Sequence, residues 1–189
     1  MDRYSTTTNY IMIWEEVYMS KNTKCLIDLL ALAIIYFRFF YGKWKIDGKD
    51  KLIINTTMYI YISFVLYFTL MPVIVSIPSI FNHRYVVMNM NLLEDYFAGR
   101  GDTVRQILLN IIMMVPFGFL LPIIKKRNLW FCILWTFLFS LGIEILQPLF
   151  VRSGDITDLV TNTIGGILGY VVYSLFKPII ERIIFLFHQ

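Results

Sequence analysis

Six polar side chains crowd a short stretch of the chain whose surroundings are almost entirely apolar. They are Glu144, Gln147, Arg152, Asp155, Asp158 and Asn162. Most neighbours in this series lie three or four residues apart, a spacing that places side chains on one face of a helix. Carboxylates beside an arginine and amides can perform acid–base chemistry or bind a polar head group. We therefore predict a ligand-binding site here, with Glu144, Asp155 and Asp158 as candidate catalytic groups.

Metal and cofactor chemistry have little support in the sequence. Two or three carboxylates can hold a divalent cation, but Arg152 would compete for the same negative charge. Cys25 and Cys132 are far apart, as are His83 and His188, so no disulfide framework, zinc site or histidine-based metal site is indicated. The chain also lacks a Ser-His-Asp, Cys-His or phosphate-loop signature. We expect neither a metal nor a cofactor.

The elements that must position these groups are membrane-spanning helices. Of the 189 residues, 58% are hydrophobic and 16% are charged, and the mean hydropathy is +0.65; a soluble domain would carry about a quarter charged residues. A helix needs roughly 20 apolar residues to cross a bilayer. Four clear spans are expected at about 52–77, 106–124, 129–151 and 156–176. The predicted fold class is an all-α, polytopic transmembrane bundle of four to five spans.

A fifth span is expected at about 24–41, although two charges interrupt it. Asp28 and Arg38 lie near its ends, where an aspartate can meet the head groups and an arginine can extend its charge to the interface. We favour spanning over a helix that lies flat on the membrane. A polar segment, 1–23, precedes this span. After the last span a short tail, 178–189, begins at a proline and is expected to lie at the interface.

Two short loops, 42–51 and 125–128, are rich in lysine and arginine. The two loops lie two spans apart and therefore on the same side, and short basic loops face the cytoplasm. We expect these loops and the C-terminus inside the cell, with loop 78–103 and the turn at 152–155 outside the cytoplasmic membrane. The net charge of +4 is explained by basic residues that flank the spans, so no nucleic-acid partner is predicted.

The last predicted span carries one face that is polar at its start and rich in glycine further on. The residues of this face are Asp155, Asp158, Asn162, Gly165, Gly166 and Gly169. They share one arc at 100° per residue. Gly165 and Gly169 form a Gly-x-x-x-Gly pair, which lets another helix backbone approach closely, so we assign the glycines to helix packing. Asn110, in an earlier span, is expected to reach the same polar cluster.

A purely structural interpretation of the cluster is weighed equally with a functional pocket. Asp155 is suited to be the N-cap of the last helix, and Asp158 would interact favourably with the helix dipole. Glu144 lies at membrane depth and needs protonation, an aqueous pocket or an arginine partner, for which Arg152 and Arg105 are the candidates. A polar core that locks the bundle would satisfy these requirements as well as a ligand site would.

The order and spacing of these residues resemble the VanZ-like family, known for teicoplanin resistance in Gram-positive bacteria. The matching residues are Asn110, Pro116, Phe117, Gly118, Glu144, Gln147, Arg152, Asp155, Asp158, Asn162, Gly165, Gly166 and Gly169. We assign 24–177 to a VanZ-like transmembrane domain with its motif core at 91–173. The chain departs from the family at 91–95, where it reads Asn-Leu-Leu-Glu-Asp and the family commonly has Asn-Leu-x-Pro-Phe.

The resemblance implies a protein that lowers susceptibility to lipoglycopeptide antibiotics such as teicoplanin through an outward-facing polar cluster. The alternative is a membrane-embedded enzyme or lipid-headgroup binder that acts on a cell-envelope precursor. In that case Glu144 would be the acid or base and Arg152 would hold an anionic head group. The expected partners are membrane lipids and a lipoglycopeptide or cell-wall precursor. Whether the protein is an enzyme, and its oligomeric state, are left open.

Overall fold

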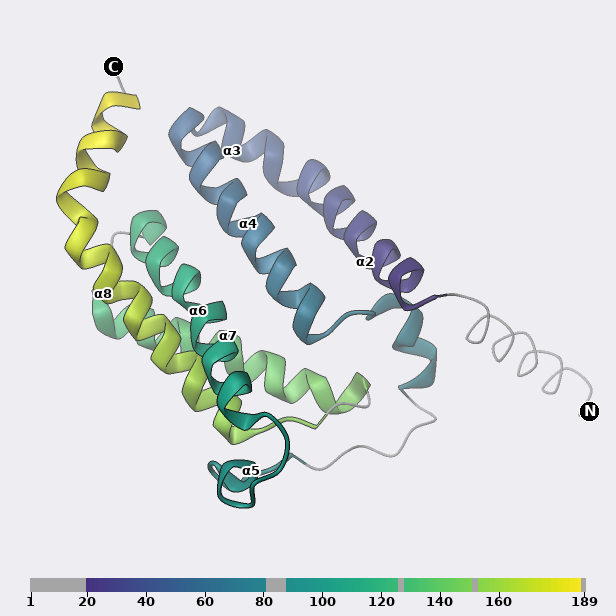
Figure 1. The fold of residues 1–189 in the computed structure, drawn as a ribbon. Helices are drawn as coiled ribbons and strands as arrows, with labels where there is room; N and C mark the ends of the chain where they lie inside the picture. The colour runs from purple at the N-terminus through teal and green to yellow at the C-terminus, as the bar shows by residue number, and fades with distance from the viewer. Residues whose placement is uncertain (1–19, 81–87, 126–127, 151–152, 188–189) are drawn as a thin grey trace, which may run out of the picture.

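The described part of the protein is built from helices joined by turns and one long loop (Figure 1). The computed structural model describes residues 20–80, 88–125, 128–150 and 153–187. The helical elements, in chain order, are α2 (Lys21–Ile35), the π-helix η1 (Tyr36–Tyr41), α3 (Gly42–Ile46), α4 (Lys49–Thr69), η2 (Ile74–Ser79), α5 (Glu94–Phe97), α6 (Thr103–Lys125), α7 (Leu129–Leu146), η3 (Gln147–Phe150) and α8 (Ile156–Phe187). Within the described ranges there is no strand, only an isolated bridge between Asn89 and Asp155. The all-α prediction is confirmed.

Five helices in the described ranges are long and apolar enough to cross a membrane, which makes the chain a multi-pass membrane protein. They are Lys21–Ile46, Lys49–Thr69, Thr103–Lys125, Leu129–Phe150 and Ile156–Leu186. The first forms because α2, η1 and α3 continue without a break. The helix expected at about 52–77 ends at Thr69 instead. Pro72 follows soon after, and proline has no N–H to continue a helix while its ring clashes with the preceding turn.

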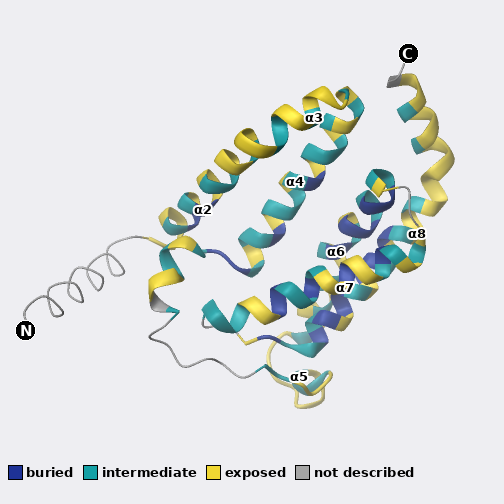
Figure 2. Cartoon of the chain, turned by 180° about the vertical axis from the view of Figure 1, so that it is seen from behind, coloured by how far each residue is buried: buried dark blue, intermediate teal, exposed yellow. Residues whose placement is uncertain are grey.

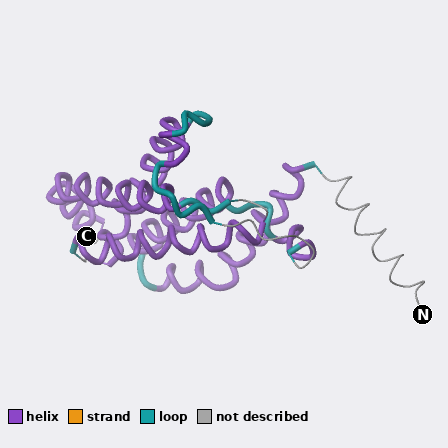
Figure 3. Tube along the Cα trace, turned by 90° about the horizontal axis from the view of Figure 1, so that it is seen from below, coloured by secondary structure: helices purple, strands orange, loops and turns teal. Residues whose placement is uncertain are grey.

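The helices fall into two groups. α2 and α4 lie side by side as a hairpin, whereas α6 and α8 pack together and α7 crosses behind them (Figure 1). Seen from below, the connecting loops cross the ends of the helices (Figure 3). Buried residues gather in α6, α7 and α8, while the hairpin is largely uncovered by protein (Figure 2). The polar cluster therefore belongs to the closely packed group.

Glycines set the distance between α8 and its neighbours. A Cβ atom on Gly169 would collide with the α6 backbone at Val115, and one on Gly165 would also meet the backbone of α6. On the side facing α7, a Cβ on Gly166 would collide with the side chain of Thr136. Small residues let membrane helices approach closely. This stripe therefore brings α6 and α7 within reach of the polar side chains of α8.

Asp28 does not meet the head groups, contrary to the expectation from its place in the first span. Its side chain is buried, with 3% exposed. The carboxylate oxygens accept hydrogen bonds from the backbone N–H groups of Val73, at 2.5 Å, and Ile74, at 2.9 Å, where η2 begins. Hydrogen bonds of this kind offset the cost of burying the carboxylate. Asp28 thus ties α2 to the segment that follows α4.

The end of α8 differs from the expected separate tail. The helix continues through Pro178 to Phe187. Lys177 and Glu181 lie one turn apart across the proline, with 3.9 Å between Nζ and Oε1. Proline is tolerated inside spanning helices where other groups satisfy the freed carbonyl. The described residues after Pro178 are therefore the last turns of one continuous helix.

Candidate functional site

Glu144, the most deeply buried acid of the predicted site, lies where the end of α7 meets the start of α8. Its side chain is 1% exposed, and Oε2 accepts a hydrogen bond from the backbone N–H of Asp155 at 2.8 Å. Gly154 makes this approach possible, because a Cβ atom there would come within 2.7 Å of the Glu144 carbonyl oxygen. The first N–H groups of a helix carry partial positive charge. The carboxylate is therefore stabilised by the start of α8.

The arginine partner expected for Glu144 is not Arg105. The Arg105 side chain is 74% exposed and lies 3.9 Å from the carboxylate of Asp102. The other candidate, Arg152, lies outside the described residues. A backbone N–H that the helix start already orients needs less ordering than a long arginine side chain. Among the described residues, this local donor is therefore the hydrogen-bond partner of the Glu144 carboxylate.

Asp155 is the N-cap of α8. Its Oδ1 accepts a hydrogen bond from the N–H of Thr157 at 2.7 Å, as N-cap residues do. Its other oxygen, Oδ2, accepts a hydrogen bond from Nδ2 of Asn89 at 3.2 Å. Capping thus uses one oxygen of the carboxylate, and the loop before α5 uses the other.

Asp158, one turn further along α8, faces amide side chains of α6. Nε2 of Gln106 lies 3.4 and 3.5 Å from its two carboxylate oxygens. The amide of Asn110 lies beside the same carboxylate, but its nitrogen is buried and hydrogen bonds to no described residue. Neutral amide donors stabilise a carboxylate less than a charged partner does. Asp158 is therefore held by comparatively weak partners.

Three buried amide groups among the predicted binding residues keep an atom without a hydrogen-bond partner among the described residues. Asn162, 2% exposed, donates from Nδ2 to Oγ of Ser140 at 2.9 Å, while its Oδ1 is unpaired. Gln147 turns toward α4, where Nε2 lies 3.5 Å from the carbonyl oxygen of Thr69, and its Oε1 is unpaired. The nitrogen of Asn110 is the third such atom. Unpaired buried polar atoms are costly unless water or a ligand meets them.

The structure brings five of the seven predicted binding residues together along one side of α8. We call this set the polar column: Asn110, Glu144, Asp155, Asp158 and Asn162. Gln147 faces α4 instead, and Arg152 is outside the described ranges. The column can accept hydrogen bonds at its carboxylates and can both donate and accept at its amides. In the part of the chain that the structure describes, no group of three or more His, Cys, Asp or Glu side chains is arranged to hold a metal ion.

A loop that carries none of the predicted site residues covers the start of α8. We call residues 88–102 the strap. The backbone N–H and carbonyl of Asn89 pair with backbone groups on either side of Asp155, at 2.9 and 3.0 Å. The N–H of Leu93 donates to Oγ1 of Thr157 at 2.9 Å. Most of these partners are backbone groups and leave no side-chain pattern. The signals in the sequence that could have indicated a role are the length of the loop and the family motif position at 91–95.

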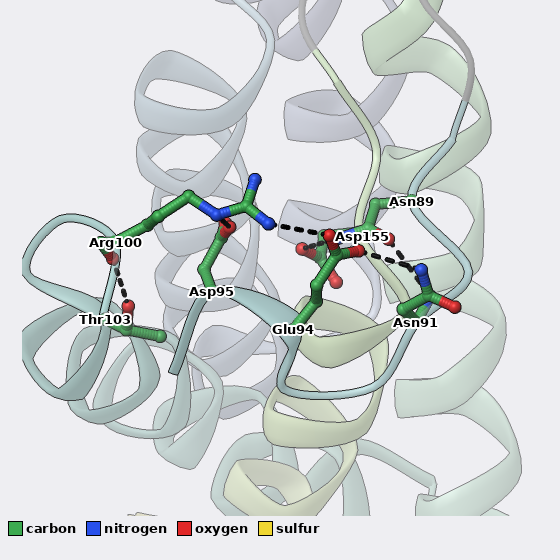
Figure 4. A network of polar contacts seen from close by, with 7 residues as sticks. All are labelled: Asn89, Asn91, Glu94, Asp95, Arg100, Thr103 and Asp155. Atoms are coloured by element: carbon green, nitrogen blue, oxygen red, sulfur yellow. Dashed lines mark hydrogen bonds and ion pairs between the residues drawn. The ribbon is translucent and has the colours of Figure 1, made fainter. Parts of the chain in front are cut away.

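Polar side chains of the strap bind one another (Figure 4). Glu94 accepts hydrogen bonds from Nδ2 of Asn91 and from the guanidinium of Arg100, both at 2.8 Å. Arg100 also lies 3.6 Å from the carboxylate of Asp95. The hydrogen bonds from Asn91 and Arg100 lower the pKa of the Glu94 carboxyl below its usual value. The two acids that stand where the family commonly has Pro-Phe therefore serve contacts within the strap.

Comparisons with known proteins agree with the motif. The family model described as VanZ/LLP1 matches residues 58–177, from within α4 to within α8, and includes the whole polar column. The chain is also 30% identical over 128 residues to Protein VanZ of Enterococcus faecium, an alignment that covers 66% of this chain and 76% of that protein. No solved structure is significantly similar to the chain. The protein belongs to the VanZ/LLP1 family.

Proposed function

We propose that this membrane protein lowers susceptibility to lipoglycopeptide antibiotics such as teicoplanin, and that its polar column faces the outside of the cytoplasmic membrane. The observation that carries the proposal is the polar column, because the residues that build it are those through which the chain resembles a family of resistance proteins. The orientation rests on the basic residues of loop 42–51 and on Lys125, which lie at the end of the bundle opposite to the strap (Figure 1).

The polar column suits a ligand rich in hydrogen-bonding groups. Glycopeptides and cell-wall precursors present amide, hydroxyl and ammonium groups, for which Asp155 and Asp158 are acceptors. The unpaired atoms of Asn110 and Asn162 add one donor and one acceptor. Binding of this kind would hold or shield a ligand without breaking a bond. The strap lies over the start of α8, so a ligand at this end of the column would have to displace it or bind against it.

Expression in a sensitive Gram-positive host tests this function. We expect the inhibitory concentration of teicoplanin to rise more than that of vancomycin. Asp158→Asn keeps the size of the side chain and should remove most of the increase at unchanged membrane abundance. Asp102→Asn, an exposed acid of the strap, is the matched control and should retain it. No increase with wild-type protein detected in the membrane would contradict the proposal.

Cysteine-accessibility mapping tests the orientation independently of resistance. Single cysteines in place of Lys45 and Lys126 should react only after the membrane is permeabilised. Cysteines in place of Arg84 and Ser153 should react in intact cells. Reaction at position 126 in intact cells would reverse the orientation and put the polar column on the cytoplasmic side.

A membrane-embedded enzyme or lipid-headgroup binder acting on a cell-envelope precursor is the second candidate. The burial of Glu144 favours it, because a carboxylate that is removed from water is costly for a role in packing alone. Glu144 would be the acid or base, and Arg152 would hold an anionic head group. Lipid extracts from cells with and without the protein separate the candidates. A changed lipid species supports an enzyme, whereas an unchanged profile with retained resistance supports binding.

A further inference from the structure

The strap has an apolar side that no described part of the protein covers. Its large apolar side chains are Met90, 65% exposed, Leu92, 52%, Tyr96, 52%, and Phe97, 79%. Apolar surface is stabilised when it is removed from water. Several such side chains gathered in one short segment therefore indicate a contact surface rather than a chance exposure.

Several hydrogen-bonding groups of the strap already have partners. Glu94 and Arg100 bind each other, and the backbone of Asn89 and Leu93 is hydrogen bonded to the first turn of α8 and the residues before it (Figure 4). The strap thus meets α8 mainly through its backbone, while its charged side chains bind one another. Its exposed apolar side chains are left for a partner.

The position of the strap identifies that partner. It lies at the end of the bundle where α6 and α8 begin (Figure 1). These helices are long and apolar enough to span the membrane, so their ends lie close to the level of the lipid head groups. Aromatic and aliphatic side chains on a segment at this level are typical of elements that lie in the membrane interface.

We propose that the strap binds the lipid surface of the nearest leaflet through Met90, Leu92, Tyr96 and Phe97, and that this contact holds its backbone against the start of α8. A lipid surface fits better than a second protein, because the apolar side chains lie at membrane level and Glu94, Asp95 and Arg100 are paired with one another. The position of Asp155, which the strap contacts through Asn89, then depends on the bilayer. The proposal holds whether or not the protein acts on lipoglycopeptides.

Spin labels at two positions of the strap measure its depth in a bilayer. Phe97→Cys and the control Asp102→Cys are made in full-length protein whose buried Cys25 and Cys132 are replaced by alanine. The labelled proteins are studied in vesicles of phosphatidylglycerol and phosphatidylethanolamine. We expect the label at 97 to be accessible to oxygen and protected from a water-soluble nickel chelate, and the label at 102 to be accessible to the chelate. Equal access of the chelate at both positions would overturn the proposal.

Hydrogen exchange tests the link between lipid contact and docking. Leu92→Gln combined with Phe97→Gln removes apolar surface without touching the hydrogen bonds to α8. We expect the amide hydrogen of Leu93 to exchange about ten-fold faster in the same vesicles, because the strap opens more often. Ile46→Gln at the end of α3 combined with Trp130→Gln in the first turn of α7, both exposed apolar residues outside the strap, should leave that rate unchanged. An unchanged rate in the strap variant, or equal acceleration in both, would contradict the proposal.

Discussion

The α2–α4 hairpin and the α6–α7–α8 group pack their helices in different ways. In the α6–α7–α8 group, glycines allow backbones to touch, as at Gly169. In the hairpin, aromatic side chains fill the space: the rings of Tyr36 and Tyr59 lie 5.3 Å apart, and the Tyr59 hydroxyl donates to the Leu32 carbonyl at 2.7 Å. An apolar groove of about 490 Å³ remains between α2 and α4. Close packing is thus confined to the group that carries the polar column.

Each region buries one carboxylate against backbone N–H groups, and the surroundings of the two carboxylates differ. Asp28 uses both of its oxygens on Val73 and Ile74. Glu144 accepts a hydrogen bond from Asp155, but nearby amides keep unpaired atoms. Where both oxygens of a buried carboxylate accept hydrogen bonds, as at Asp28, stabilisation of the fold is enough to explain why the residue is there. Incomplete hydrogen bonding around a second one indicates a place where water or a ligand completes the site.

The largest difference between the two regions is expected from enlarging a small residue. Gly169→Leu should force α6 away from α8 and destabilise the protein by about 3 kcal/mol, the upper part of the usual range for overpacking. Ala33→Leu, at the wall of the groove between α2 and α4, should change stability by less than about 0.5 kcal/mol. Membrane abundance and thermal unfolding in detergent measure both. Similar losses in the two variants would show that glycine contacts do not distinguish the regions.

Replacing each buried carboxylate by the corresponding amide tests whether Asp28 serves stability and Glu144 serves function. Asp28→Asn should lower stability by about 1–2 kcal/mol, because one buried N–H loses its acceptor, and resistance per molecule should not change. Glu144→Gln should reduce resistance while abundance holds. Immunoblots of membranes and inhibitory concentrations of teicoplanin test both. If Glu144→Gln, Asp158→Asn and Arg152→Gln all keep full resistance, the polar column is structural and our site assignment is wrong.

A smaller effect is expected at the contact between the strap and α8. Asn89→Ala removes the hydrogen bond from Nδ2 to Asp155 and the acceptor of the Asn91 N–H, but keeps the backbone bonds of residue 89 to Gly154 and Ile156. The start of α8 should therefore lose about 1 kcal/mol. Faster hydrogen exchange at the Ile156 amide would report this loss. Asn91→Ala, which removes only the contact with Glu94 inside the strap, is the control. Equal exchange at Ile156 in both variants would argue against a special role of Asn89.

The smallest effect is expected from pH. Because Asn91 and Arg100 lower the pKa of Glu94 in the folded protein, the carboxylate stabilises the strap fully at pH values above its ordinary pKa of 4.5. This contribution should be lost as the pH falls through the lowered folded value. Hydrogen exchange of strap amides from neutral to acidic pH measures the loss. Glu94→Gln should abolish this pH dependence, and a dependence that persists in Glu94→Gln would assign it to another group.

Much of the fold and part of the site followed from sequence. Long apolar runs predicted spanning helices because a bilayer requires them, although the end of α4 was placed too late and the continuation of α8 through Pro178 was not foreseen. Helical periodicity placed Asp155, Asp158 and Asn162 on one face of α8. Arg105, by contrast, was wrongly considered as a partner of Glu144, since periodicity describes faces within one helix and not the reach of side chains between helices.

The sequence by itself determined the class of the protein, the helical elements, the family and the polar face of α8, because these depend on composition and local spacing. Only the tertiary structure decided what meets each buried group. Among the described residues, Glu144 and Asp28 accept hydrogen bonds from backbone N–H groups, and the strap docks on α8 mainly through its backbone at Asn89 and Leu93. Every residue except proline carries such an N–H. Which backbone N–H meets a given carboxylate is therefore set by the path of the chain and not by the residue type.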